Sequence, residues 1–129
     1  MTFVPTHLAY YRNIHQVSVV NSICFRFKDK NIIYGIRCRA NDMIYIGSTM
    51  NVITRIKQHL LILDHTSKPL QADVTKLGLQ WFTFYVFEVV SFPNHLNYSQ
   101  RQVYLHKVEQ QYMDMIPKSK LYNVYRSSS

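Results

Sequence analysis

Two β-rich segments separated by four turn-forming residues constrain this chain more than any other feature. Residues 31–38 and residues 43–47 are both rich in isoleucine and tyrosine. Between them, residues 39–42 read Arg-Ala-Asn-Asp, and Asn and Asp are common in tight turns. Two such segments joined by a short polar turn predict a β-hairpin.

Helical spacing follows the hairpin. Apolar side chains recur every three or four residues over 52–64, and Ser48 or Thr49 can cap this helix. A second, shorter helix is expected over 70–77, ended by Gly78. The hairpin is therefore followed by two helices.

The second half of the chain supplies one more strand and one more helix. Residues 81–90 are dominated by aromatic and β-branched side chains, which predicts a buried central strand. A last helix is expected over 99–116, stopped by Pro117, and residues 121–125 are apolar enough to dock back onto the fold. The order β-β-α-α-β-α predicts an α+β domain with a small antiparallel or mixed three-stranded sheet flanked by helices.

The first 30 residues differ in composition, with four basic residues and one acidic residue. We expect residues 1–30 to be a basic N-terminal extension, 31–126 one domain and 127–129 a tail. Residues 23–27 could form an extra strand. A mitochondrial transit peptide is the alternative interpretation of this acid-poor segment. We expect an intracellular protein, in the mitochondrion or another organelle or in the cytoplasm.

Composition narrows the function classes. Fifteen basic residues against seven acidic ones give a net charge of +8, and the pI of about 9.6 favours polyanionic partners such as nucleic acid. A hydrophobic fraction of 47% excludes a mostly disordered chain. No apolar run approaches the ~18–20 residues that cross a bilayer. The two cysteines, Cys24 and Cys38, are too few for a disulfide framework, and we expect reduced thiols.

Four polar side chains suit phosphate chemistry. A hairpin that folds near residues 39–40 places Tyr34 and Tyr45 opposite or nearly opposite each other. Arg55 and His59 lie four residues apart on the first helix and share a face. Arginine stabilises phosphoryl charge and histidine moves protons near neutral pH. On these residues alone, aromatic packing and a solvated polar face explain the same pattern.

Glu109 interrupts an apolar stripe on the last helix. Its neighbours on the stripe are Leu105, Tyr112 and Ile116. A carboxylate on a core-facing stripe needs a cation or a metal ion as its partner. Mg²⁺ accepts one or two carboxylates and completes its shell with water and phosphate. The alternative is an amphipathic helix whose apolar face has been drawn one residue too wide.

Taken in order, these residues resemble the GIY-YIG nuclease superfamily. The second tripeptide of that family is intact as Tyr45-Ile46-Gly47, and the first appears as Ile32-Ile33-Tyr34, with isoleucine in place of glycine. The resemblance spans roughly residues 31–125. The family's arginine and two histidines are matched here by Arg55, His59 and His65, and its Leu-Gln pair by Leu70-Gln71. Its metal-binding glutamate with a following aromatic is matched by Glu109 and Tyr112, and its late Tyr-Asn by Tyr122-Asn123.

The resemblance implies a metal-dependent DNA endonuclease, with an intron-encoded homing enzyme as one form of it. One Mg²⁺ or Mn²⁺ ion on Glu109 would hold the scissile phosphate. Tyr34, or Tyr45 with His59, would take the proton from the attacking water, and Arg55 would stabilise phosphoryl charge. His65 and Asn123 would orient the site.

Two other interpretations stay open at this point. The fold could serve as a nucleic-acid-binding part of a larger ribonucleoprotein, such as an organellar ribosome, with hydrolysis lost or unused. The similarity could also be incidental, in which case the candidate residues would not converge in space.

Overall fold

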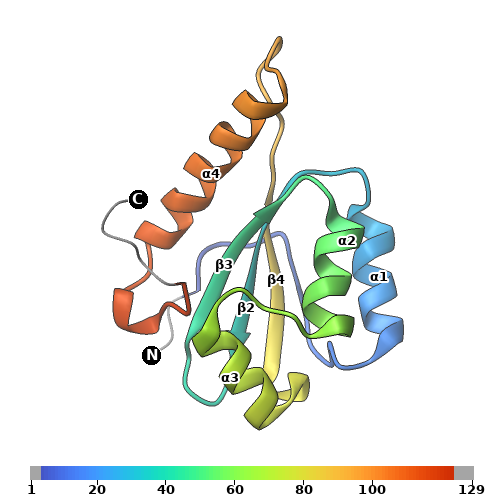
Figure 1. Cartoon of the computed structure of the whole chain (residues 1–129), viewed down its shortest axis with the longest axis vertical. Helices are drawn as coiled ribbons and strands as arrows, with labels where there is room; N and C mark the ends of the chain where they lie inside the picture. The colour runs from blue at the N-terminus through green and yellow to red at the C-terminus, as the bar shows by residue number, and fades with distance from the viewer. Residues whose placement is uncertain (1–3, 124–129) are drawn as a thin grey trace.

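A four-stranded antiparallel sheet with helices on both faces forms the frame of the protein (Figure 1). The coordinates are a computed structural model, which describes residues 4–123. The strand order is β1-β4-β2-β3. The strands are β1 (Ala9–Tyr11), β2 (Ile32–Cys38), β3 (Ile44–Thr49) and β4 (Phe82–Val89). The helices are α1 (Val17–Phe27), α2 (Val52–Lys57), α3 (Lys68–Leu77) and α4 (Tyr98–Asp114), with short turns at Gln58–Ile62, Leu79–Trp81 and Lys118–Lys120.

The predicted α+β class is confirmed, but the sheet has four strands rather than three. The additional strand is β1, which pairs with β4. Residues 23–27, considered as a possible extra strand, are instead the end of helix α1, so that interpretation was wrong. The physical reason is a helical stripe of apolar side chains that is visible only over a longer window. Its buried members are Val20, Ile23, Cys24 and Phe27.

The hairpin forms where predicted, with its turn slightly later in the chain. The Cys38 amide donates to the Met43 carbonyl, and Asp42 adopts a left-handed backbone with φ of 63°. Tyr34 therefore pairs with Gly47, and Tyr45 pairs with Ile36. The two tyrosines are diagonal neighbours on one face of the sheet rather than directly opposite.

The predicted first helix is two segments. β3 continues through Thr49, so the cap of α2 is Asn51, whose side chain accepts the Thr54 amide, and not Ser48 or Thr49. From residue 58 the chain forms one π-helical turn over Gln58–Ile62. Leu63 ends it in a left-handed conformation with φ of 61°. This wider turn follows directly after α2 and carries His59.

Each face of the sheet has its own hydrophobic core. Helices α1, α2 and α3 cover one face, where Tyr34, Ile56 and Phe84 are buried. Helix α4 covers the other, where Ile33, Ile46 and Leu105 are buried. Figure 1 shows α4 on one side of β3 and α2 on the other. Among the helices described, none combines the length and apolarity needed to cross a membrane.

The segment after α4 returns to the outer edge of β3. The Tyr122 amide donates to the Ile44 carbonyl, and the Asn123 side chain bonds both the amide and the carbonyl of Ile46. The expected docking is thus present over 121–123, and residues 124–125 lie outside the described residues. This contact covers the first half of the β3 edge and leaves the half around Ser48 uncovered by it.

Candidate active site

The candidate residues gather around Gly47 on the edge strand β3. A side chain at this position would start 2.4 Å from Cζ of Tyr34 and 2.5 Å from its hydroxyl oxygen. Glycine is therefore required, because the Tyr34 ring lies directly against the backbone there. Phe84 stacks on the Tyr34 ring with centroids 5.5 Å apart. The phenol is held between a strand backbone and a buried aromatic ring.

A chain of hydrogen bonds leads from this phenol into the core. The Tyr34 hydroxyl oxygen lies 2.7 Å from Nε2 of His59, and Nδ1 of His59 lies 2.8 Å from Nδ1 of His65. A neutral imidazole has a single N–H, so both bonds run from Tyr34 towards His65 or both run the opposite way. The three side chains therefore form a path along which a proton can move in either direction.

Burial sets the protonation states along this path. Burial, together with the smaller effects of the neighbouring His65 and Arg55, lowers the pKa of His59 to about 3. Burial also lowers the pKa of His65, against the opposing charge of Asp64. The pKa of Tyr34 is raised by burial and by Tyr45 and Glu109, despite the Arg55 charge. Both histidines are therefore neutral near pH 7 and Tyr34 keeps its proton.

The far end of the path is His65, which lies just before α3 and is held there by a residue of that helix. The His65 amide donates to the Gln71 side chain at 2.9 Å. Its ring nitrogen Nε2 is buried and has no hydrogen-bond partner within the described part of the chain. Buried polar atoms rarely stay unpaired, and this atom is where the chain of hydrogen bonds ends.

Tyr45 and Arg55 border the path on its open side. Tyr45 is half-buried, with ring centroids 6.4 Å from Tyr34 and 5.7 Å from His59. Burial and the Glu109 charge raise its pKa, and a hydrogen bond with Thr66 lowers it. The half-buried Arg55 lowers the pKa of both tyrosines through its positive charge. Arg55 is thus the cation nearest to both phenols.

Glu109 approaches the same place from the opposite face of the sheet. Its carboxylate accepts a 2.5 Å hydrogen bond from Ser48, the residue after Gly47. Burial raises its pKa, opposed by the Ser48 bond and by the charge of His106. In the region described, no basic side chain forms an ion pair with this carboxylate. The site therefore straddles β3, with phenols and imidazoles on one face and a carboxylate on the other.

These donors fit a hard divalent cation. Among residues 4–123, no three His, Cys, Asp or Glu side chains come together as a metal-binding group. One half-buried carboxylate without a cationic partner, next to a serine hydroxyl, leaves most coordination positions to water and phosphate oxygens. That is the mode of binding that Mg²⁺ prefers.

Comparison with known families agrees with this geometry. A family model described as the GIY-YIG catalytic domain matches residues 30–114, which is more than half of the chain. The chain belongs to the GIY-YIG catalytic-domain family. This family consists of nucleases, so the resemblance and the fold expected from it are confirmed. Neither a curated protein nor a solved structure matches the chain significantly.

This GIY-YIG domain carries a second carboxylate on the α4 face. Glu88 of β4 accepts a 2.8 Å hydrogen bond from Tyr112 of α4, and burial and this bond raise the pKa of Tyr112 to about 12. Glu88 thus has a neutral donor of its own. The charge of Glu109 raises the pKa of both Tyr34 and Tyr45, whereas the charge of Glu88 is not among the causes of either shift. The sequence analysis did not single out Glu88.

The other sequence candidates of this GIY-YIG domain occupy distinct places. Asn123 bonds the backbone of β3 at Ile46, and its predicted role in orienting the substrate stays a prediction. Ile32, which replaces the family's glycine, is fully buried in the core on the Tyr34 face. Ser48 was considered only as a helix cap. Its real partner could have been found from strand alternation, since Ser48 faces away from Tyr45 and Gly47.

Proposed function

We propose that this protein is a metal-dependent endonuclease that hydrolyses phosphodiester bonds in DNA. The observation that carries the proposal is the meeting of both phenols, Arg55 and Glu109 at Gly47 on one edge strand. The charges of Arg55 and Glu109 both act on the two tyrosines, with opposite sign. A nuclease needs a proton acceptor, a cation for phosphoryl charge and an anionic metal ligand, and these residues supply all three.

Tyr34 is the residue we assign to proton transfer. A tyrosine with a raised pKa is a poor base unless it can lose its own proton at the same moment. His59 Nε2, 2.7 Å away and neutral, can take the hydroxyl proton while Tyr34 accepts one from the attacking water. The His59 Nδ1 proton then moves to His65, where the Asp64 charge partly offsets the cost of burying a cation. Tyr34 ends the step protonated, as it began.

Arg55 and Glu109 are assigned to the phosphate. Arg55 would pair with the non-bridging phosphoryl oxygens, whose charge grows in the transition state. Glu109 would hold the divalent cation, and Ser48 would keep the carboxylate oriented through its hydrogen bond. When bound, such a cation polarises the phosphate and stabilises the leaving oxygen.

The alternative is a retained nucleic-acid-binding module of a larger ribonucleoprotein, for example in an organelle. The observation in its favour is the burial of Tyr34, whose side chain is only 1% exposed. Binding through basic side chains alone needs no divalent ion and weakens steeply with salt. Metal dependence therefore separates the two functions.

A plasmid-cleavage assay tests the proposal. Purified protein is incubated with supercoiled DNA in Mg²⁺ or in EDTA, and Glu109→Gln is compared with Glu88→Gln. We expect nicking only in Mg²⁺, a loss of about 10³-fold in Glu109→Gln, and a near-normal rate in Glu88→Gln. Binding of nucleic acid without cleavage by the unmodified protein under any of these conditions would refute the nuclease and favour the binding module.

A further inference from the structure

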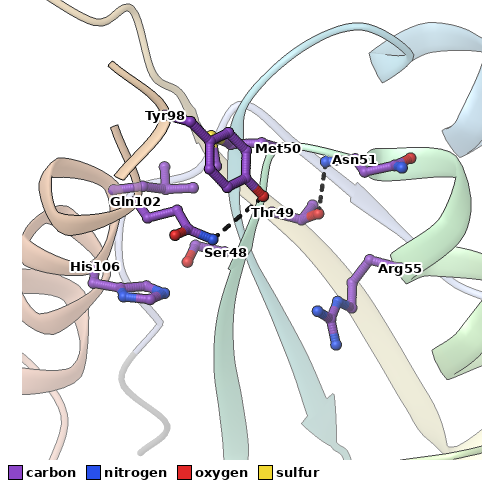
Figure 2. Close-up of a pocket in the computed structure, with 9 residues that line it drawn as sticks. Ser48, Thr49, Met50, Asn51, Arg55, Tyr98, Gln102 and His106 are labelled. Carbon is purple, nitrogen blue, oxygen red and sulfur yellow. Dashed lines mark hydrogen bonds between the residues drawn. The ribbon is translucent and has the colours of Figure 1, made fainter. Parts of the chain in front are cut away.

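A polar pocket lies beside the candidate active site and belongs to none of the assignments above. It has a volume of about 180 Å³ and is bounded by the end of β3, the start of α2 and the first half of α4. Figure 2 shows Tyr98, Gln102 and His106 along α4 on one side and Arg55 from α2 on the other. Ser48 and Thr49 lie between them.

The pocket shares two walls with the active site. Ser48 lines the pocket and donates its hydroxyl to Glu109, and Arg55 lines the pocket and acts on both tyrosines. A chain that places a phosphate at Arg55 and Glu109 therefore brings its next unit to this pocket. The pocket is smaller than the roughly 300–1,000 Å³ of pockets that enclose whole small molecules. It therefore suits part of a polymer unit, such as a base, better than a free ligand.

The lining offers what a nucleotide requires. None of the nine side chains that line the pocket is acidic, and Arg55 and His106 supply basic groups. The Tyr98 ring is 67% exposed at the rim. An exposed aromatic ring offers a surface on which an unpaired base can stack. The exposed tyrosine therefore favours a base, and the basic groups favour the phosphate attached to it.

Gln102 is held in a position to contact the edge of that base. Its Nε2 donates to the Tyr98 hydroxyl at 3.3 Å, which couples the amide to the ring. The amide keeps its carbonyl oxygen and a second N–H for a ligand. Glutamine amides pair with base edges through a donor and an acceptor together.

We infer that this pocket holds one nucleotide adjacent to the bond that is cut, with Tyr98 stacked on its base and Gln102 contacting the base edge. The inference rests on the proposed nuclease function for its place in the reaction. It makes Gln102 a specificity-determining residue, so the enzyme discriminates between bases at one position next to the cut.

Crosslinking tests the binding directly and needs no cleavage. Short DNA duplexes with 5-iodouracil in place of every thymine of one strand are irradiated with the protein in EDTA, and the crosslinked peptide is mapped. We expect a crosslink on Tyr98 that Tyr98→Ala removes. Tyr10→Ala, which changes an exposed tyrosine of β1, should leave it in place. Crosslinks confined to other parts of the protein would overturn the pocket.

Cleavage of a randomised DNA pool tests the specificity. We expect the unmodified protein to prefer certain bases at one position, and Gln102→Ala to flatten that preference by about 10-fold. Gln111→Ala, an exposed glutamine further along α4, serves as the matched control. An unchanged preference in Gln102→Ala would overturn the specificity role. A Tyr98 crosslink in a protein that cuts no DNA would keep the pocket and refute the nuclease, while cleavage without that crosslink does the reverse.

Discussion

The two faces of the sheet at β3 differ in how far their polar side chains are buried and bonded to one another. On the Tyr34 face, Tyr34, His59 and His65 are buried and bonded to one another. On the α4 face, Glu109 is half-buried, bonded to Ser48, and close to an open pocket that shares the Ser48 wall. The three side chains on the Tyr34 face are thus already bonded to one another, whereas the carboxylate side borders an open pocket. A single strand, β3, separates the two, and the Tyr34 ring lies directly against it at Gly47.

The largest expected effect comes from breaking the path on the buried face. Tyr34→Phe keeps the ring that Phe84 stacks on and removes the hydroxyl that bonds His59. We expect single-turnover DNA nicking to fall by about 10²–10⁴-fold, the usual contribution of a positioned acid or base. Nicking rates in Mg²⁺ at saturating protein measure this.

Tyr122→Phe is the matched control for that variant. Tyr122 is also buried, and its hydroxyl donates to Asp73 at 2.7 Å, away from the His59 path. Both variants should lose about 1–2 kcal/mol of stability. An equal loss of nicking in both would show that Tyr34 acts only through the fold.

The same buried face should make the protein sensitive to acid. The pKa of His59 is lowered to about 3 from 6.5, so the unfolded chain binds more protons between these values. The contribution of the neutral His59 to the free energy of unfolding is therefore fully present above pH 6.5 and is lost as the pH drops towards 3. The loss between pH 7 and pH 5 is on the order of 2 kcal/mol. Urea unfolding at the two pH values measures this. His59→Gln should lose less between them, and an equal loss would contradict a neutral His59.

Gly47→Ala tests how tightly the Tyr34 ring packs against the backbone of β3. The new methyl would meet the Tyr34 ring at 2.4 Å, and the stacked Phe84 prevents that ring from retreating. We expect a loss of about 1–3 kcal/mol in unfolding free energy, as for overpacked cores. In the double variant with Tyr34→Ala the added penalty should vanish. If it persists there, the clash lies with another group.

The smallest expected effect concerns the outer edge of β3. Asn123→Ala removes two hydrogen bonds to the Ile46 backbone, of 2.9 and 2.8 Å, worth about 1–2 kcal/mol together. The strand β3 carries Tyr45 and Ser48, so we expect nicking to fall. The fall should be less than tenfold, because Asn123 bonds only the backbone of the strand. Asn94→Ala, in an exposed loop, is the control for thermal and urea unfolding. A loss as large as that of Tyr34→Phe would point to direct contact with substrate.

Patterns local to a few residues made most of the fold predictable. The hairpin, the helix after it, the strand now seen as β4 and the last helix all rest on short-range periodicity or turn chemistry. Helix α1 was missed because its β-branched and aromatic side chains favour a strand within five residues and show their helical period only over eleven. In this segment tertiary packing of the helix outweighs the local preference of these residues for a strand.

The site was predictable as a set of residues but not as an arrangement. Spacing placed Arg55 and His59 on one helix, yet the π-helical turn that starts at Gln58 leaves His59 buried and Arg55 half-exposed. A register shift in β2–β4 pairing falls between Ile33 and Tyr34, so one residue of β4 is passed over beside the phenol. Such irregularities depend on side-chain packing from distant segments, which a single sequence does not display.

The pairing of β1 with β4 has a practical consequence for anyone who wishes to trim or fuse this protein. The family match begins at residue 30, but β1 and α1 supply a sheet edge and part of the core before it. A shortened gene product starting at residue 30 would expose the backbone of β4 together with apolar surface, which invites aggregation. A shortened version that keeps the fold therefore has to start upstream of β1.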